Sequence, residues 1–145
     1  MLIYLSFLKM KEIAFKNSRS SKRFDSSIQI LINDMLDKND IAYKREYEIK
    51  FYSIDNYLFE HNLFIEVMGD YWHSSPLKYN ENKYKINEIQ WKTLQHDKQK
   101  HTYIKNHFNK EILYLWEYDI KYNMDVCEKL MLLYISNNGV LDNYH

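Results

Sequence analysis

Two acidic residues, Asp55 and Glu66, stand on neighbouring segments with strand-like patterns, at residues 53–59 and 63–68. Residues 60–62 predict a tight turn between them, so the two segments are expected to pair as a β-hairpin. Carboxylates that face one another across such a pair repel unless a cation lies between them. Mg²⁺ is held by one or two carboxylates with waters and substrate phosphates, and it can activate a water beside a phosphate. The plainer alternative is an exposed strand face, or ion pairs with lysine and arginine.

A second candidate group begins in the same segment, because Glu66 interrupts an apolar run and is costly to bury without a metal or a hydrogen-bonded partner. His73 follows the end of this run and can act as a general acid or base near neutral pH. Asp97, on a predicted helix, can hold an imidazole in one tautomer, and Lys100 can reach a phosphate. The alternatives are a surface histidine and a charged helix face with an i,i+3 ion pair.

The elements that must position these residues follow from hydrophobic periodicity. Apolar residues at helical spacing predict a helix to about residue 38, capped by Ser26 or Ser27. Further patterns predict helices at 87–108 and 126–135 and strands at 41–51, 53–59, 63–68 and 111–117. The order α-β-β-β-α-β-α predicts an α/β or α+β core, with a small central sheet of about four strands covered by helices.

The composition predicts one domain of 145 residues, with an N-terminal arm at 1–24, a core at 25–120 and a C-terminal helix and tail at 121–145. The 20 basic and 20 acidic side chains balance, so net charge alone does not indicate nucleic acid. A local cluster that includes Arg19, Lys22 and Arg23 still permits one basic face, although a solvated surface is the plainer interpretation.

The cysteine content and the hydropathy of the chain indicate its redox compartment and whether it contacts a membrane. Cys127 is the single cysteine, which excludes an internal disulfide and a cysteine-based zinc cluster and fits a reducing cytoplasm. Residues 1–8 are apolar but too few to span a membrane. No membrane partner is therefore expected.

The ordered set of candidate residues resembles a known family. A strand aspartate and a strand glutamate are followed by Gly69-Asp70-Tyr71-Trp72-His73, an aspartate on a helix, and Leu115-Trp116-Glu117. This set is similar to the very-short-patch-repair-like nucleases, the EDxHD branch of the PD-(D/E)xK endonuclease superfamily. The resemblance runs from about residue 27 to 120 and implies a restriction-endonuclease-like core with a mixed sheet.

Roles carried over from the resemblance fall on individual positions of this chain. Asp55 would be the main metal ligand, Glu66 the second acidic position, and the Val67 carbonyl a possible further ligand. His73 would act on water or on the scissile phosphate, with Asp97 as its orienting partner. Trp72 looks like the aromatic residue that packs the site, whereas the fold alone would place its side chain in the hydrophobic core.

The chain also departs from the family pattern. Ile54 replaces the usual proline before the first acid, and Met68 stands where the acid-x-Lys pattern has lysine. Gln29 aligns with the first glutamate of EDxHD. A glutamine keeps the shape of glutamate and lacks its charge. In another register, Asp25 or Asp34 would take this position. With one cysteine, no structural zinc is expected, which favours the zinc-free phage and homing members.

The resemblance implies a Mg²⁺- or Mn²⁺-dependent DNA endonuclease of repair or homing type, which nicks or cuts double-stranded DNA. Arg19, Lys22 and Arg23 are expected to contact the DNA backbone, and a homodimer or a further DNA-reading partner is a possibility. The expected location is the cytoplasm, at the nucleoid or in a phage-infected cell. Two alternatives stay open: a nuclease fold that binds DNA with weakened catalysis, and a non-enzymatic α/β interaction domain.

Overall fold

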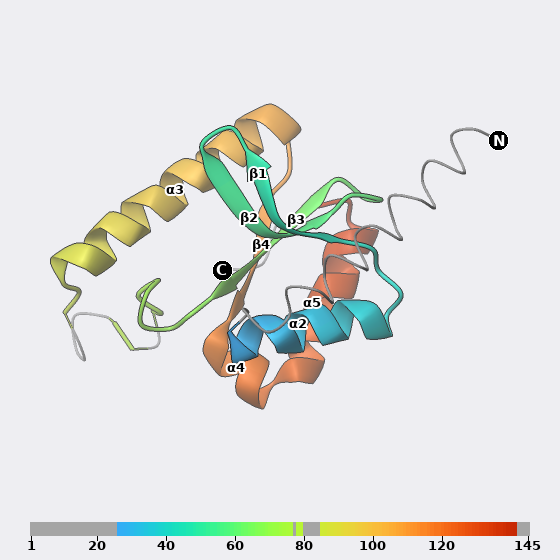
Figure 1. Cartoon of the computed structure of the whole chain (residues 1–145), viewed down its shortest axis with the longest axis horizontal. Helices are drawn as coiled ribbons and strands as arrows, with labels where there is room; N and C mark the ends of the chain where they lie inside the picture. Colours follow the sequence, from blue (N-terminus) through green and yellow to red (C-terminus); the bar gives the residue numbers. More distant parts are fainter. Residues whose placement is uncertain (1–25, 77, 80–84, 142–145) are drawn as a thin grey trace.

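The computed structural model describes residues 26–76, 78–79 and 85–141 (Figure 1). Residues 1–25 lie outside it, and with them the whole of the predicted arm at 1–24. The elements in chain order, labelled as in Figure 1, are α2 (Ser27–Lys38), β1 (Lys44–Ile49), β2 (Tyr52–Leu58), β3 (Leu63–Met68), α3 (Glu88–Phe108), β4 (Ile112–Trp116), α4 (Glu117–Tyr122) and α5 (Met124–Ser136).

The four strands form one mixed sheet in the order β1-β2-β3-β4. The first two pairings are antiparallel, and β3 and β4 run parallel. A parallel pair needs a long crossover, which α3 supplies between its two strands. Figure 1 shows α3 on one side of the sheet and α2, α4 and α5 on the other. The prediction of an α/β fold with a four-stranded mixed sheet between helices is confirmed.

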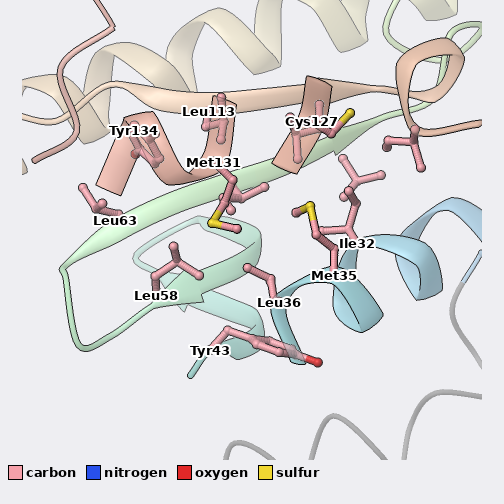
Figure 2. Close-up of a cluster of buried hydrophobic side chains, with 14 residues drawn as sticks. Ile32, Met35, Leu36, Tyr43, Leu58, Leu63, Leu113, Cys127, Met131 and Tyr134 are labelled. Atoms are coloured by element: carbon pink, nitrogen blue, oxygen red, sulfur yellow. The ribbon is translucent and has the colours of Figure 1, made fainter. Parts of the chain in front are cut away.

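Two apolar clusters fix the sheet between its helices. In the larger one, residues of α2 and α5 such as Leu36 and Met131 converge on Leu113 and Leu63 of the sheet (Figure 2). The smaller one packs Ile104 of α3 against the opposite face. All six residues of β3 are buried; Leu63, Ile65 and Val67 belong to the larger cluster, and Phe64 belongs to the smaller one on the opposite face. Each buried leucine or isoleucine contributes about 1.5–3 kcal/mol.

Tyr134 of α5 joins β3 to the start of β4 through its hydroxyl. This group donates to the carbonyl of Glu111 at 2.5 Å and accepts from the backbone N–H of Phe64 at 3.1 Å. The side chain is fully buried, so the hydroxyl needs these partners. The contact fastens α5 at the end of the sheet remote from the loop that follows β3.

The strands β2 and β3 pair only from Leu58↔Leu63 to Asn56↔Ile65, although both continue further. Beyond that point the backbone N–H of Val67 donates to Oδ2 of Asp55 at 2.8 Å. The carboxylate thus replaces a ladder acceptor where the strands separate. This local opening places Asp55 beside the end of β3.

Most predicted boundaries agree with the structure, with two corrections. The segment predicted as a strand over 41–51 is a strand only at Lys44–Ile49, because Lys50, with φ 53°, starts the turn into β2. Helix α4 was not predicted: it has six residues and no side-chain cap of its own, so it lacks the usual start signal. Within the described residues, no helix is long and apolar enough to cross a membrane.

Candidate active site

A pocket of about 380 Å³ opens where the sheet meets the starts of two helices. Its walls come from five segments: the start of α2, strand β2, strand β3, the loop after β3, and the first residue of α4. The lining residues are Ser26, Ser27, Ile28, Gln29, Asp55, Val67, Gly69, Trp72, His73 and Glu117. Five residues expected to act together thus line one cavity: Gln29, Asp55, Val67, Trp72 and His73.

The two predicted acids are neighbours with different surroundings. Asp55 is half-buried and faces the pocket, whereas Glu66 is buried and does not line it. Burial raises the pKa of Glu66 well above its usual range, and the nearby charge and hydrogen bond of Asp55 raise it further. Lys100 opposes that rise. The predicted proximity of Asp55 and Glu66 across the hairpin is therefore present.

Lys100 lies on the buried carboxylate and not in the pocket. Its Nζ is 2.5 Å from Oε1 of Glu66 and donates to the carbonyl of Ser53 at 2.9 Å. The lysine and glutamate side chains are 12% and 7% exposed, so the pair is held away from water. The expectation that Lys100 reaches a phosphate does not match this position, because the carboxylate of Glu66 and the Ser53 carbonyl bind its ammonium.

His73 and Asp97 meet at the side of the pocket. Nδ1 of His73 is 2.6 Å from Oδ2 of Asp97, although the two residues come from the loop after β3 and from α3. A carboxylate at Nδ1 favours the tautomer whose Nε2 is free to accept a proton. The histidine also borders a second, smaller hollow next to Asp97 and Tyr114. The arrangement suits a general base.

Gln29 is held by two fully buried amides. Its Nε2 donates to Oδ1 of Asn33 at 3.0 Å and to Oδ1 of Asn56 at 2.7 Å, and Nδ2 of Asn56 donates to Asn33 at 3.0 Å. This network uses the nitrogen that a glutamate lacks. The neutral side chain therefore fits its surroundings at this wall of the pocket.

Two predictions for the binding of DNA remain, one for Trp72 and one for three basic residues near the N-terminus. The indole of Trp72 is 59% exposed at the rim of the pocket, so the core interpretation is wrong for this residue. Its ring meets that of Tyr71 edge-on, with centroids 5.1 Å apart. The basic residues Arg19, Lys22 and Arg23 lie outside the described part of the chain.

Sequence reasoning did not identify several polar residues at the site. Asn33 and Asn56 sit at apolar-patterned positions of α2 and β2, and an amide at a core position was the available signal. Asp70 and Glu117 were in the ordered set but received no settled role, because their contact joins segments distant in the chain: the Asp70 N–H donates to Oε1 of Glu117 at 3.1 Å.

A divalent metal in this pocket would need oxygen donors from the chain, with water or phosphate completing its shell. Within the described residues, no three of His, Cys, Asp and Glu come together as a ligand cluster. Asp55 and Glu66 provide two carboxylates near the end of the paired strands, but Glu66 is bound by Lys100 and does not line the pocket. Mg²⁺ can be held by one carboxylate when waters and phosphate complete its shell. Asp55 is the donor that reaches the pocket, so a metal there would rest mainly on Asp55 and on the adjacent backbone.

Comparison with known proteins defines the class of fold. No protein-family model and no curated protein matches the chain. Among solved structures, it is similar to the catalytic domain of the homing endonuclease I-Bth0305I, with a TM-score of 0.56 and 18% sequence identity. The match covers 79% of this chain and 98% of that domain. The chain therefore has a nuclease-type α/β fold.

Proposed function

We propose that this protein is a metal-dependent DNA endonuclease of the very-short-patch-repair-like, EDxHD type. The observation that carries the proposal is the convergence of Asp55 and the His73–Asp97 pair at one pocket. The fold shared with a homing endonuclease catalytic domain supports the same class. Double-stranded DNA would be the substrate and Mg²⁺ or Mn²⁺ the cofactor, in a repair or homing role.

Asp55 would hold the metal, with Glu66 as the second acid and the Val67 carbonyl as a further donor. When bound, Mg²⁺ would supply charge neutralisation at the scissile phosphate and lower the pKa of a nearby water. His73 would take a proton from the attacking water at Nε2, while Asp97 stabilises the imidazolium through Nδ1–H. Gln29 would orient water or phosphate at the opposite wall, through a side chain fixed by its amide partners.

Lys100 has a supporting role in this proposal. Its ammonium neutralises Glu66 at 2.5 Å and thereby allows two acids to lie close together in a buried setting. Trp72, exposed at the rim, would contact DNA beside the pocket, and Arg19, Lys22 and Arg23 would contact the backbone. These contacts would position the duplex without reading its sequence.

A second candidate is a DNA-binding protein with this fold but little catalysis. The observation that favours it is the neutral amide of Gln29 at the pocket wall, together with the engagement of Lys100 by Glu66. Tight duplex binding without cleavage in any divalent metal would select this candidate.

Plasmid cleavage tests the proposal directly. Supercoiled DNA is incubated with the wild-type protein and with Asp55→Ala, each in Mg²⁺ and in EDTA. Nicked or linear product is expected only for the wild type with Mg²⁺. Equal activity in all four conditions would contradict the assignment of a metal to Asp55.

A further inference from the structure

The turn between β1 and β2 carries the most exposed large apolar side chain among the described residues. The pairing of Ile49 with Tyr52 leaves Lys50 and Phe51 as a two-residue turn. The side chain of Phe51 is 90% exposed. Lys50 adopts φ 53°, a conformation for which such turns favour glycine, asparagine or aspartate. A cation and an aromatic ring thus occupy a strained turn where neither is buried, and stability alone does not explain them.

Helix α3 holds this turn in place. The rings of Tyr52 and Tyr103 lie with their centroids 5.5 Å apart, and Nζ of Lys50 lies 5.9 Å from the centroid of the Tyr103 ring. Nζ of Lys100 donates to the carbonyl of Ser53 at 2.9 Å. The same helix carries the aspartate that contacts the histidine of the candidate site. The position of the turn is therefore fixed relative to that site.

The turn lies at the end of the sheet where the candidate site opens. Because β2 and β3 are antiparallel, the start of β2 and the end of β3 lie at the same end. Phe51 precedes Asp55 by only part of one strand, so at about 3.3 Å per residue the two lie within about 13 Å of each other. That span corresponds to about four base-pair steps of duplex DNA, at about 3.4 Å each. A duplex bound at the pocket can therefore extend to the turn.

A hollow of about 440 Å³ lies between Tyr52, at the start of β2, and the outer face of α3. Amide, hydroxyl and cationic side chains contribute to its lining, among them Gln95, Lys98, Gln99 and Asn106. Among the described residues, no aspartate or glutamate lines it. Lysine and amide groups donate hydrogen bonds to phosphate oxygens, and no carboxylate of the lining repels them. The hollow therefore suits a polyanion.

We propose that the β1–β2 turn and this hollow form a second contact surface for double-stranded DNA, in which Phe51 packs in a groove of the duplex and Lys98 binds its backbone. This inference rests on the proposed nuclease function and says where the duplex continues beyond the pocket. Apolar side chains of DNA-binding proteins insert between base steps, and backbone contacts add affinity that falls with salt. The surface contains neither Asp55 nor His73, so its loss should weaken binding and leave the bond-breaking step intact.

The test measures the affinity of the full chain for a fluorescent random-sequence duplex in EDTA, over a series of salt concentrations. Phe51→Ala is expected to weaken binding about tenfold or more, because the ring is no longer buried against DNA. Lys98→Ala is expected to reduce the slope of log affinity against log salt concentration by about 0.9, the value for one lost phosphate contact. The controls Leu133→Ala and Lys129→Ala remove exposed side chains of α5, across the sheet from α3 (Figure 1), and should match the wild type.

Two further measurements separate the outcomes. The single-turnover cleavage rate at saturating protein and the mass of the free protein by light scattering should both be the same in Phe51→Ala as in the wild type. Wild-type affinity in Phe51→Ala and Lys98→Ala would overturn the inference, and so would an equal loss of affinity in the controls. A changed mass in Phe51→Ala with unchanged duplex affinity would assign the surface to a second copy of the chain and also overturn it. If the two variants weaken binding but the wild type does not cleave in Mg²⁺, the proposed function fails and this DNA contact stands.

Discussion

Asp55 and Glu66 are adjacent acids of one hairpin, yet they lie in different environments. Asp55 faces an open pocket with the histidine, whereas Glu66 is buried behind an ammonium at 2.5 Å. The difference shows that a pair of carboxylates need not act as a symmetrical metal clamp. One acid lines the pocket, and the other has its charge balanced inside the fold. Substitutions that separate chemistry from stability can therefore test this comparison.

The largest effect is expected from Asp55→Asn. The amide oxygen can still accept the hydrogen bond from Val67 N–H, and the loss of charge removes repulsion with Glu66. Folding stability should therefore stay close to wild type, while cleavage falls by at least about 10²–10³-fold because charge stabilisation at the phosphate is lost. Plasmid cleavage and chemical unfolding measure the two quantities. Retained cleavage would place the chemistry elsewhere.

His73→Ala should reduce cleavage by about 10²–10⁴-fold, since a general base is removed from the pocket. His96→Ala is the matched control, because that histidine is exposed on α3 and packs near the ring of Tyr52. Single-turnover cleavage at saturating enzyme measures both, and added imidazole should partly restore His73→Ala alone. An equal loss in both variants would argue against a specific role for His73.

Lys100→Met tests the surroundings of the buried acid, Glu66. It leaves Glu66 buried without its counter-ion, so the free energy of unfolding should fall by about 3–5 kcal/mol near neutral pH. Glu66 has a raised pKa in the folded state, so the folded state binds its proton more tightly than the unfolded state. The stability lost should therefore be regained as pH falls through the folded-state pKa toward the usual glutamate range.

The double variant Lys100→Met with Glu66→Gln is the control for that prediction. Because it removes both charges, it should unfold at a higher denaturant concentration than Lys100→Met alone and show less dependence on pH. Denaturant titrations at several pH values supply the comparison. A single variant as stable as the wild type at neutral pH would show that the pair does not balance a buried charge.

Tyr134→Phe should have the smallest effect on chemistry. Removing its hydroxyl leaves the Phe64 N–H and the Glu111 carbonyl without these hydrogen bonds, which costs about 1–3 kcal/mol of stability. The cleavage rate per folded molecule should be unchanged, because the contact lies away from the pocket. A loss of kcat in the fully folded variant would show that the far end of the sheet influences the site.

The sequence was sufficient for the elements that carry strong periodicity. Strand β3 was predicted with its observed bounds, α2 begins after Ser26, one of the two expected caps, and α3 ends at Phe108 as predicted. Helix α4 was missed, since it has only six residues and no side-chain cap that would signal its start. Local signals identify an element only where its stabilising contacts are also local.

The candidate site shows the same limit. The contact of His73 with Asp97 agrees with the pairing that the family resemblance implied. The sequence alone could not show that Lys100 turns toward Glu66, because one helix offers several faces to its neighbours. Nor could it reveal the amides of Asn33 and Asn56 behind Gln29, whose partners are set by the packing of α2 on the sheet.

The most direct test of the central claim is the anomalous diffraction of Mn²⁺ in crystals of this protein. A peak is expected beside the Asp55 carboxylate in the pocket, and it should be lost in Asp55→Asn while the Glu66–Lys100 contact persists. A peak that is unaffected by Asp55→Asn, or no peak there at millimolar Mn²⁺, would contradict the claim that Asp55 is the acid that serves the chemistry.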